Sequence, residues 1–335
     1  MSIKIGINGL GRIGRLALRN VWEDPGFEVV GINSRSSAKL YAHLTKYDSS
    51  YGHWNIPISA EGNEALVLDG KKIPLFHEHD PVNVPWGDLG AEVIIESTGV
   101  FRSREDSAKH LRAGAKKVVI SSPAKDADVT LVRGVNLDVY NPKKHHVISA
   151  ASCTSNCLAP VAKTLHDNLG IKHGYLITIH AYTNDQSLVD APHKNEDLRR
   201  ARAAYESIIP TNTGAADTLA LLMPELKGKL SGMSMRVPVM LPSVINLSVE
   251  VNKKTTAEAV NQMLKDASNN GFKGIMDVSD IELVSIDYKE NPHASIVDTP
   301  LTKVMDDTFV NVVSWYDNEW GYVHQMNQLI KAIIV

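Results

Sequence analysis

A cysteine at the expected start of a helix is the residue whose setting most directly suggests chemistry. Cys153 follows Ser152 in the segment 149–157, where a strand-like run gives way to a helical one. Ser152 is a favourable N-cap and places Cys153 in the first turn, where the helix dipole lowers the pKa of a thiol. We therefore expect Cys153 to be a nucleophile. Cys157 lies one turn further along and is interpreted as a buried small residue.

A thiolate nucleophile needs a general base or a cationic partner. The best candidate is His180, which ends the alternating segment 175–181 just before a long polar stretch. A histidine at the end of a strand is often structural, and His193, within the polar stretch, is a rival.

Groups that suit a phosphate or another anion follow further along the chain. Thr213 and Gly214 open an expected helix and offer a hydroxyl and backbone N–H groups. Arg200 and Arg236 supply fixed charge and two-pronged donors. The other arginines of the segment 199–202 are more simply a solvated or interfacial face.

A glycine-rich turn near the amino terminus indicates a dinucleotide site. Gly9, Gly11 and Gly14 form the pattern GxGxxG between an apolar strand, 3–8, and a helix that begins at Arg12. In this context the glycines allow a tight turn, a close approach of a pyrophosphate and close strand–helix packing. The helix N-terminus then faces the phosphates.

The end of the second expected strand bears on the choice of cofactor. An acid for the adenosine ribose hydroxyls is expected about 20 residues after the glycines, but the chain has Asn33, Ser34 and Arg35 there. Ser34 and Arg35 offer donors that suit a 2′-phosphate, and no carboxylate repels it, so the sequence favours NADP over NAD. The simpler alternative is that Arg35 is a solvated loop residue and that NAD binds without the acid.

The elements that must position these groups change in pattern near residue 150. Before it, strands are expected at 3–8, 27–32, 93–95 and 117–121, helices at 12–23, 38–47 and 104–113, and a hairpin at 56–76 with Asp69-Gly70 at its tip. After it, helices are expected at 153–169, 256–268 and 322–334 and strands at 175–181, 245–251 and 309–315. The first pattern predicts a Rossmann-type doubly wound parallel sheet, and the second an α+β domain on a mixed or antiparallel sheet. Residues 182–210 are expected to be a functional or interfacial loop.

The overall composition excludes several classes of protein. The chain has 335 residues, a formal net charge of −3, 43% hydrophobic residues and two cysteines. This length allows about two domains, and the charge provides no bulk attraction to nucleic acid or anionic membranes. Two cysteines cannot make a disulfide framework, and the histidines show no zinc spacing. We expect a cytoplasmic globular protein with no metal site, no membrane association and no primary nucleic-acid role.

Together these residues resemble the phosphorylating glyceraldehyde-3-phosphate dehydrogenase family over essentially the whole chain. The segments that carry the resemblance are INGLGRIGR (7–15), ASCTSNCLAP (151–160), HAYTNDQ (180–186), LRRAR (198–202) and SWYDNE (314–319). The resemblance implies that the Cys153 thiolate attacks the aldehyde of glyceraldehyde 3-phosphate, with His180 activating the thiol. Hydride then passes to NADP or NAD, and inorganic phosphate cleaves the thioester to give 1,3-bisphosphoglycerate, a reversible step of glycolysis and gluconeogenesis.

The resemblance also assigns roles at matching positions. For the substrate and the attacking phosphate it implies Ser152, Thr154, Thr183, Arg200, Thr213, Gly214 and Arg236. For the cofactor, the three glycines and the Ser34–Arg35 pair are joined by Arg12, Ile13, Ser97, Thr98, Gly99 and Ser121, with Asn318 orienting the nicotinamide amide.

The same resemblance implies a division of the chain and an assembly. Residues 1–151 are expected to bind the dinucleotide, 152–317 to form the catalytic domain, and 318–335 to return to the first domain as a helix. The loop 182–210 is expected to pack against a neighbour's cofactor in a homotetramer. Ser34 stands where NAD-preferring members have an acid, and His79 where many have arginine, so the cofactor preference stays open.

Three other functions compete with this interpretation. Erythrose-4-phosphate dehydrogenase shares the fold and the thiol chemistry. A dinucleotide-binding regulatory or nucleic-acid-binding protein with a spent site is disfavoured by the net charge and by the Cys153–His180 pair. A cysteine hydrolase without a cofactor leaves the glycine-rich turn unexplained.

Overall fold

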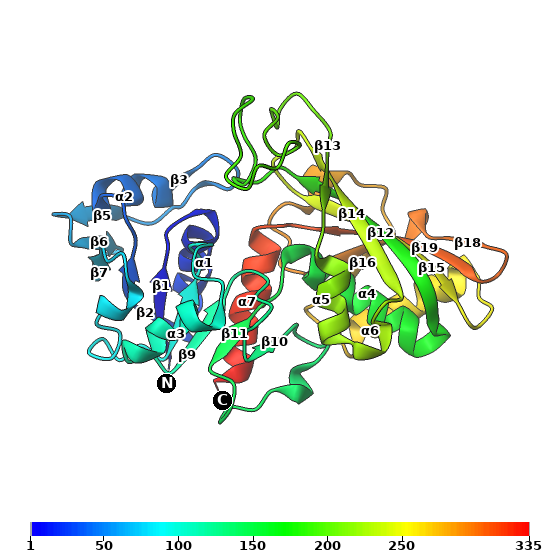
Figure 1. Ribbon diagram of the computed structural model, residues 1–335, viewed down its shortest axis with the longest axis horizontal. Helices are drawn as coiled ribbons and strands as arrows, with labels where there is room; N and C mark the ends of the chain where they lie inside the picture. The colour runs from blue at the N-terminus through cyan, green and yellow to red at the C-terminus, as the bar shows by residue number, and fades with distance from the viewer. Residues whose placement is uncertain (1, 335) are drawn as a thin grey trace. The chain divides into compact units, whose positions relative to one another are not determined.

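Strands and helices alternate through the amino-terminal part of the chain and build the sheet of the first of two structural units (Figure 1). This computed structural model describes residues 2–334, and the first unit takes in 2–131, 137–151 and 326–334. The strands of its nine-stranded sheet are, in spatial order, β10 (Val129–Thr130), β11 (Val147–Ser149), β9 (Lys117–Ile120), β8 (Val93–Glu96), β1 (Ile3–Asn8), β2 (Phe27–Asn33), β7 (Lys71–Phe76), β6 (Ala65–Leu68) and β5 (Ile58–Glu61).

The strands from β10 to β7 run parallel, and the chain winds outward from β1 in both directions. The helices of this unit are α1 (Arg12–Trp22), α2 (Ala38–Lys46) and α3 (Arg104–Arg112). The carboxyl ends of β1, β2 and β8 therefore meet where the strand order reverses, the place at which doubly wound sheets bind ligands. The predicted Rossmann-type sheet is confirmed.

The expected hairpin is one strand longer than predicted. Asp69 and Gly70 join β6 to β7 with φ angles of 47° and 78°, the left-handed pair that a tight hairpin turn requires. β6 also pairs with β5, so this segment is an antiparallel meander whose last strand joins the parallel sheet at β2. A second small hairpin consists of β3 (Tyr47–Asp48) and β4 (Gly52–His53).

The second unit takes in Val132–Asn136 and Ser152–Gln325. Its mixed sheet has the order β13 (Ile209–Asn212), β14 (Leu230–Val237), β12 (Ile171–Ala181), β15 (Ser243–Val251), β19 (Phe309–Tyr316), β17 (Ser295–Asp298) and β16 (Met276–Ser279), with β18 (Lys303–Met305) paired to β19. Only the β12–β14 and β16–β17 pairs are parallel among these described strands. The predicted α+β unit on a mixed sheet is confirmed.

One face of this sheet is covered by helices, as the alternating sequence of β15 predicts. Ile245, Leu247, Val249 and Val251 are fully buried, whereas the residues between them are half-buried. The helices are α4 (Cys153–Leu169), α5 (Ala215–Leu222) and α6 (Ala257–Asn269). α4 packs across the middle strands, and α5 and α6 lie beside α4 on the same side of the sheet (Figure 1).

The last helix, α7 (Trp320–Ile333), begins in the second unit and ends in the first, where the change falls between Gln325 and Met326. The expected domain boundaries, which divide the chain into 1–151, 152–317 and 318–335, stay a prediction. Short 3-10 turns complete the chain: η1 (Pro81–Asn83), η2 (Leu137–Val139), η3 (Pro224–Leu226), η4 (Ser285–Tyr288) and η5 (Thr299–Leu301). Within residues 2–334, helices fall short of the length and apolar character that crossing a membrane requires.

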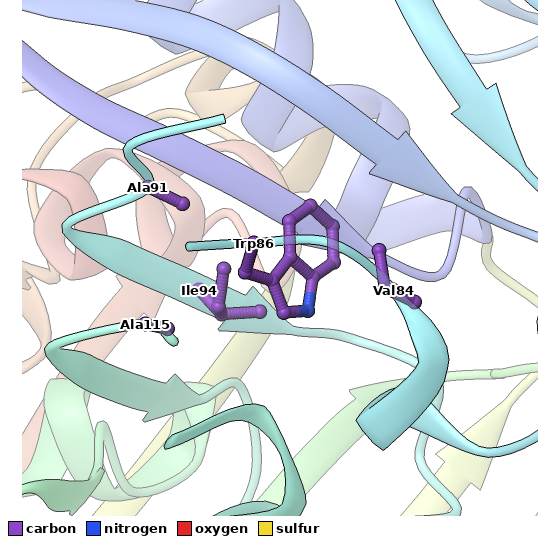
Figure 2. Packing of buried hydrophobic residues seen from close by; sticks show 5 residues of the cluster. All are labelled: Val84, Trp86, Ala91, Ile94 and Ala115. Atoms are coloured by element: carbon purple, nitrogen blue, oxygen red, sulfur yellow. The ribbon is translucent and has the colours of Figure 1, made fainter. Parts of the chain in front are cut away.

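A tryptophan anchors a cluster of buried apolar residues beneath the first sheet. Figure 2 shows the indole of Trp86 beside Val84, Ala91, Ile94 and Ala115, all of which are buried. Gly6 in β1 makes room for this ring, because a Cβ there would lie 2.7 Å from Trp86 Cζ3. The indole Nε1 donates a hydrogen bond to His110 Nδ1 at 3.0 Å.

Candidate active site

The proposed nucleophile and base come together because β12 follows α4 directly and runs antiparallel to it. The 17 residues of α4 span about 25 Å, and the chain then turns at Gly170 and returns along β12, where Ile171 to His180 rise about 30 Å. His180 thereby reaches the start of α4 again. Cys153 Sγ lies 3.5 Å from His180 Nε2, which is the contact that the sequence analysis predicts.

The first turn of α4 is capped as expected. Ser152 Oγ accepts a hydrogen bond from the Ser155 N–H at 3.0 Å. Thr154 Oγ1 is bound by the Tyr316 hydroxyl at 2.9 Å, and the same hydroxyl lies 2.9 Å from Thr178 Oγ1. The expected phosphate ligands Ser152 and Thr154 are thus already engaged in holding the helix start, and their role towards phosphate stays a prediction.

The ring of His180 is oriented from its far side. Nδ1 lies 2.6 Å from the Ala181 carbonyl oxygen and 3.0 Å from Arg236 Nη1, which also donates to that carbonyl at 3.2 Å. A carbonyl can only accept and a guanidinium can only donate. From the shorter contact we infer that Nδ1 carries the hydrogen and donates to Ala181, which leaves the Nε2 lone pair facing the thiol of Cys153.

The pKa values of this pair correct one expectation. Burial raises the pKa of the Cys153 thiol, although Arg236 acts in the opposite direction, whereas the helix start alone was expected to lower it. Burial and then Arg236 lower the pKa of His180 to about 3. An isolated charge on either group is therefore disfavoured, because desolvation exceeds the effect of the helix dipole. Proton transfer from Sγ to Nε2 creates both charges together, where they attract each other.

Arg236 is the strongest candidate for holding an anion beside this pair. It lies in register with His180 across the parallel strands β12 and β14. Burial lowers its pKa, and its buried Nε has no hydrogen-bond partner among the described residues. A buried guanidinium N–H without a partner fits an anionic ligand, because leaving it unpaired costs about 1–3 kcal/mol.

The other predicted anion ligands are placed less directly. Thr183 is half-buried three residues beyond His180. Arg200 is paired with Asp185 at 3.1 Å and with Asp197 at 2.6 Å. The Arg200 backbone N–H and guanidinium lower the pKa of Asp197 to about 2. The carboxylates of Asp185 and Asp197 therefore compete with phosphate for Arg200.

Thr213 and Gly214 form the junction of β13 and α5. Thr213 Oγ1 accepts from the Ala215 N–H at 3.3 Å, and Gly214 is the N-cap of α5 with no side-chain cap. A Cβ on Gly214 would meet nothing within 4 Å, so the backbone here is open to a ligand. The rival base His193 instead faces Asp185, with 3.6 Å between Nε2 and Oδ1.

A pocket in the first unit holds the predicted dinucleotide residues. Its volume is about 260 Å³ and it lies at the carboxyl ends of β1, β2 and β8. Predicted residues in its lining are Gly9, Gly11, Ser34, Arg35, Ser97 and Thr98. Residues that sequence reasoning left without a role there are Asn8, Leu10, Asn33, Tyr41, Glu78, Val100 and Phe101, with His79 noted only as a departure.

The glycine-rich turn fits a dinucleotide phosphate. Gly9 has φ +97°, and a Cβ there would lie 2.8 Å from the Thr98 nitrogen, while a Cβ on Gly14 would lie 1.8 Å from the Gly9 carbonyl oxygen. A Cβ on Gly11, in contrast, would meet nothing within 4 Å. Gly9 and Gly14 therefore permit the turn, and Gly11 leaves the space at the start of α1 open for a phosphate.

The two residues expected to select NADP behave differently. Ser34 is buried, its Oγ accepts from the Leu10 N–H at 3.1 Å, and it is also bound to the Tyr41 hydroxyl. Arg35 is exposed at the pocket. The Ser34 hydroxyl is therefore committed to the protein, and Arg35 is the member of the pair whose side chain is available to a 2′-phosphate.

The remaining predicted cofactor residues lie outside that lining. Arg12 forms an ion pair with Asp48 at 2.6 Å, and Ile13 and Ser121 are half-buried. Gly99 is exposed just after Thr98. In the second unit, Asn318 is buried and its Oδ1 accepts from Ser243 Oγ at 3.0 Å, which fixes the orientation of its amide. The roles of these residues stay predictions.

Two signals could have found the residues that were missed. Asn8 and Asn33 are polar residues at the carboxyl ends of buried parallel strands, the edge at which ligands bind. Tyr316 occupies a buried position at the end of β19, inside the segment SWYDNE, and its ring lies edge-on to His180 with 6.0 Å between centroids.

Comparisons with known proteins agree with this arrangement. Residues 3–104 match the family model described as "Glyceraldehyde 3-phosphate dehydrogenase, NAD binding domain", and residues 152–318 match the corresponding "C-terminal domain". The glyceraldehyde-3-phosphate dehydrogenase of Geobacillus stearothermophilus is 54% identical over 333 residues, covering 99% of this chain and 98% of the relative. Glyceraldehyde-3-phosphate dehydrogenase 1 of Bacillus subtilis is 51% identical with the same coverage. The Streptomyces coelicolor enzyme is 48% identical, with 98% of each chain covered.

Proposed function

Because the chain belongs to the glyceraldehyde 3-phosphate dehydrogenase family, we propose that it converts D-glyceraldehyde 3-phosphate and inorganic phosphate reversibly into 1,3-bisphosphoglycerate. The observation that carries this proposal is the 3.5 Å contact of Cys153 Sγ with His180 Nε2 beside a buried arginine. This arrangement supplies a nucleophile, a base and an anion site in one place.

The first half of the reaction forms a thioester on Cys153. The sulfur attacks the aldehyde carbon while its proton passes to His180 Nε2, and the imidazolium then protonates the new alkoxide to give a thiohemiacetal. Next, Nε2 takes back the hydroxyl proton as the carbon–hydrogen bond breaks with its electron pair. The nicotinamide ring, when bound, accepts that hydride. Nε2 of His180 thus carries one proton from the thiol to the alkoxide and takes it back from the hydroxyl as the hydride leaves.

The second half releases the product. Inorganic phosphate attacks the thioester carbon, the carbon–sulfur bond breaks, and the departing sulfur takes a proton from His180. Arg236, whose Nε has no partner within residues 2–334, holds one phosphate, and Thr183 supports the substrate at the same site. Ser152, Thr154, Arg200, Thr213 and Gly214 complete the proposed anion sites.

For the cofactor we propose a preference for NADP over NAD. Gly9, Gly11, Ser97 and Thr98 would hold the dinucleotide in the pocket of the first unit. Arg35 would bind the 2′-phosphate at the rim, and the buried Ser34 removes the carboxylate that would repel it.

Replacing Arg35 with alanine should raise the KM for NADP about tenfold and leave that for NAD within about twofold. The change removes one charge-assisted contact to the 2′-phosphate, which NAD lacks. Initial rates with both cofactors measure it. Lys39→Ala is the matched control, because this exposed lysine carries the same charge outside the pocket lining. A strong NAD preference in the natural protein, unchanged in the Arg35 variant, contradicts the proposal.

We propose further that the protein is a cytoplasmic homotetramer. Apolar side chains of the loop 182–210 are exposed in the single chain, with Leu188 at 68% and Leu198 at 85%. Half-buried Ile177 and Val313 lie on the sheet face opposite the helices. Both features favour burial against other copies. Both cysteines are free, and thiols stay reduced most readily in a reducing compartment such as the cytoplasm.

Cofactor reduction measured with and without inorganic phosphate tests the function. We expect sustained turnover of glyceraldehyde 3-phosphate only with phosphate, because without it the thioester accumulates after about one turnover. Erythrose 4-phosphate serves as the comparison substrate and should give a lower kcat/KM. A higher kcat/KM for erythrose 4-phosphate, with no dependence on phosphate, would instead support the erythrose-4-phosphate alternative.

A further inference from the structure

A chain of buried hydrogen bonds crosses the first unit from the apolar cluster to the pocket. Trp86 Nε1 donates to His110 Nδ1 at 3.0 Å, and His110 Nε2 lies 3.1 Å from Glu96 Oε2. The same carboxylate accepts from Asn8 Nδ2 at 2.5 Å and from the Thr98 N–H at 2.8 Å. Trp86 and His110 are fully buried, and Glu96 and Asn8 are exposed by no more than 2%.

The chemistry of the indole determines the state of His110. An indole N–H can only donate, so Nδ1 must accept and the ring is neutral with its hydrogen on Nε2. Nε2 then donates to Glu96, which is the ionised member of the pair. Asn8 Nδ2 and His110 Nε2 lie 3.4 Å apart, as expected for two donors that share one carboxylate oxygen. The Thr98 hydroxyl also binds this carboxylate.

These contacts satisfy a charge that would otherwise be costly. Taking a carboxylate out of water is unfavourable unless hydrogen bonds replace its hydration. Glu96 ends β8 and Asn8 ends β1, and the two strands are paired at this position. The carboxylate therefore joins the carboxyl ends of both strands. His110 donates to this carboxylate, and Trp86 in turn donates to His110. Figure 2 shows the indole among the buried apolar residues Val84, Ala91, Ile94 and Ala115.

The series of buried hydrogen bonds that begins at Trp86 ends at the surface of the dinucleotide pocket. Asn8 and Thr98 line it, and Asn8 Oδ1 accepts from Nδ2 of Asn33, a third lining residue, at 2.8 Å. Thr98 is exposed there, and its backbone packs closely against Gly9: a Cβ on Gly9 would lie 2.8 Å from the Thr98 backbone nitrogen. A shift of Glu96 would move all three lining residues together.

We propose that His110 and Trp86 are positioning residues for the cofactor, acting through Glu96 on Asn8 and Thr98. Neither residue lines the pocket, and neither takes part in the chemistry at Cys153. Their role is to fix the two carboxylate oxygens of Glu96, which bind Asn8 and Thr98 beside the glycine-rich turn. The proposal rests on the proposed function in one respect, that this pocket binds the dinucleotide.

The test is His110→Leu, which puts an apolar side chain of similar size in place of the imidazole and removes both of its hydrogen bonds. We expect the Kd for NADP and NAD, measured by calorimetry, to rise about tenfold, and KM for the cofactor to rise in parallel. The kcat at saturating cofactor should stay near the natural value. Alkylation of Cys153 by iodoacetamide in the cofactor-free protein should change less than about twofold, because that site lies wholly in the second unit.

Two further variants separate positioning from structure. His110→Gln restores an N–H for Glu96 and an acceptor for Trp86, and should recover most of the affinity. His173→Leu makes the same change at an exposed histidine and should bind like the natural protein. An unchanged Kd in folded His110→Leu overturns the proposal. So does a parallel loss of thermal stability, kcat and alkylation that glutamine does not rescue.

A third variant covers a failure of His110→Leu to fold. Trp86→Phe removes the indole N–H and keeps a ring in the cluster, and its Kd should rise in the same direction. An unchanged Kd in that variant also overturns the proposal. If the natural protein itself binds neither dinucleotide, the proposed function fails first, and the result is distinct from a failure of the positioning role.

Discussion

Replacing Cys153 with serine should reduce kcat by on the order of 10⁴-fold or more, while the Kd for the cofactor stays unchanged. A serine hydroxyl has a far higher pKa than a thiol, so transfer of its proton to His180 is much less favourable. The serine also forms an oxygen ester in place of a thioester, which phosphate cleaves less readily. Steady-state rates and cofactor titration on the same preparation measure the two effects.

Cys157→Ser is the matched control for this experiment. Cys157 is fully buried one turn further along α4, and its Sγ lies 3.6 Å from Ser295 Oγ and 3.8 Å from the Ser314 carbonyl oxygen. Those polar groups can bind a serine hydroxyl, so activity should stay close to that of the natural protein. Normal turnover by the Cys153 variant would refute the thioester pathway, and equal losses in both variants would show that the substitution acts through folding.

Replacing His180 with asparagine should lower kcat by about 10²–10⁴-fold, the usual contribution of a positioned base. The thiol then titrates without its partner, and burial holds its pKa above the ordinary value. At neutral pH less thiolate forms, so alkylation of Cys153 should slow. Raising the pH towards the thiol pKa increases the thiolate fraction, and the difference from the natural protein should shrink. Alkylation rates across a pH series measure this.

His193→Asn tests the rival base under the same conditions. His193 faces Asp185 and not the thiol, so its variant should keep most of the activity and the natural pH profile of alkylation. If the His193 variant shows the larger loss, or if the His180 variant alkylates at the natural rate at neutral pH, the assignment of the base is wrong.

The parts that the sequence predicts well are those governed by neighbours along the chain. The GxGxxG turn, the Asp69-Gly70 hairpin tip and the Ser152 cap depend on backbone conformations that only a few residue types adopt. The strand-helix alternation before residue 150 likewise predicts the parallel sheet, because a helix between two strands returns the chain to the end of the sheet at which the first strand began.

The parts that it predicts poorly depend on residues far apart in sequence. The sequence places a histidine and a cysteine near element ends, but their 3.5 Å contact needs α4 to pack antiparallel to β12. The direction of the Cys153 pKa shift was wrong, because a local pattern shows the helix dipole and not the amount of water excluded. Ser34 shows the same limit, since its hydroxyl is taken up by Leu10 and Tyr41.

By itself, then, the sequence determined which groups this protein has for its chemistry and the order of the elements that carry them, since turn, cap and periodicity signals are local. Only the tertiary structure decided which histidine meets the thiol, which arginine keeps an unpaired N–H, and how Glu96 is held beneath the pocket. Those outcomes depend on desolvation and on partners brought together by sheet packing, and such partners leave no mark at a fixed spacing along the chain.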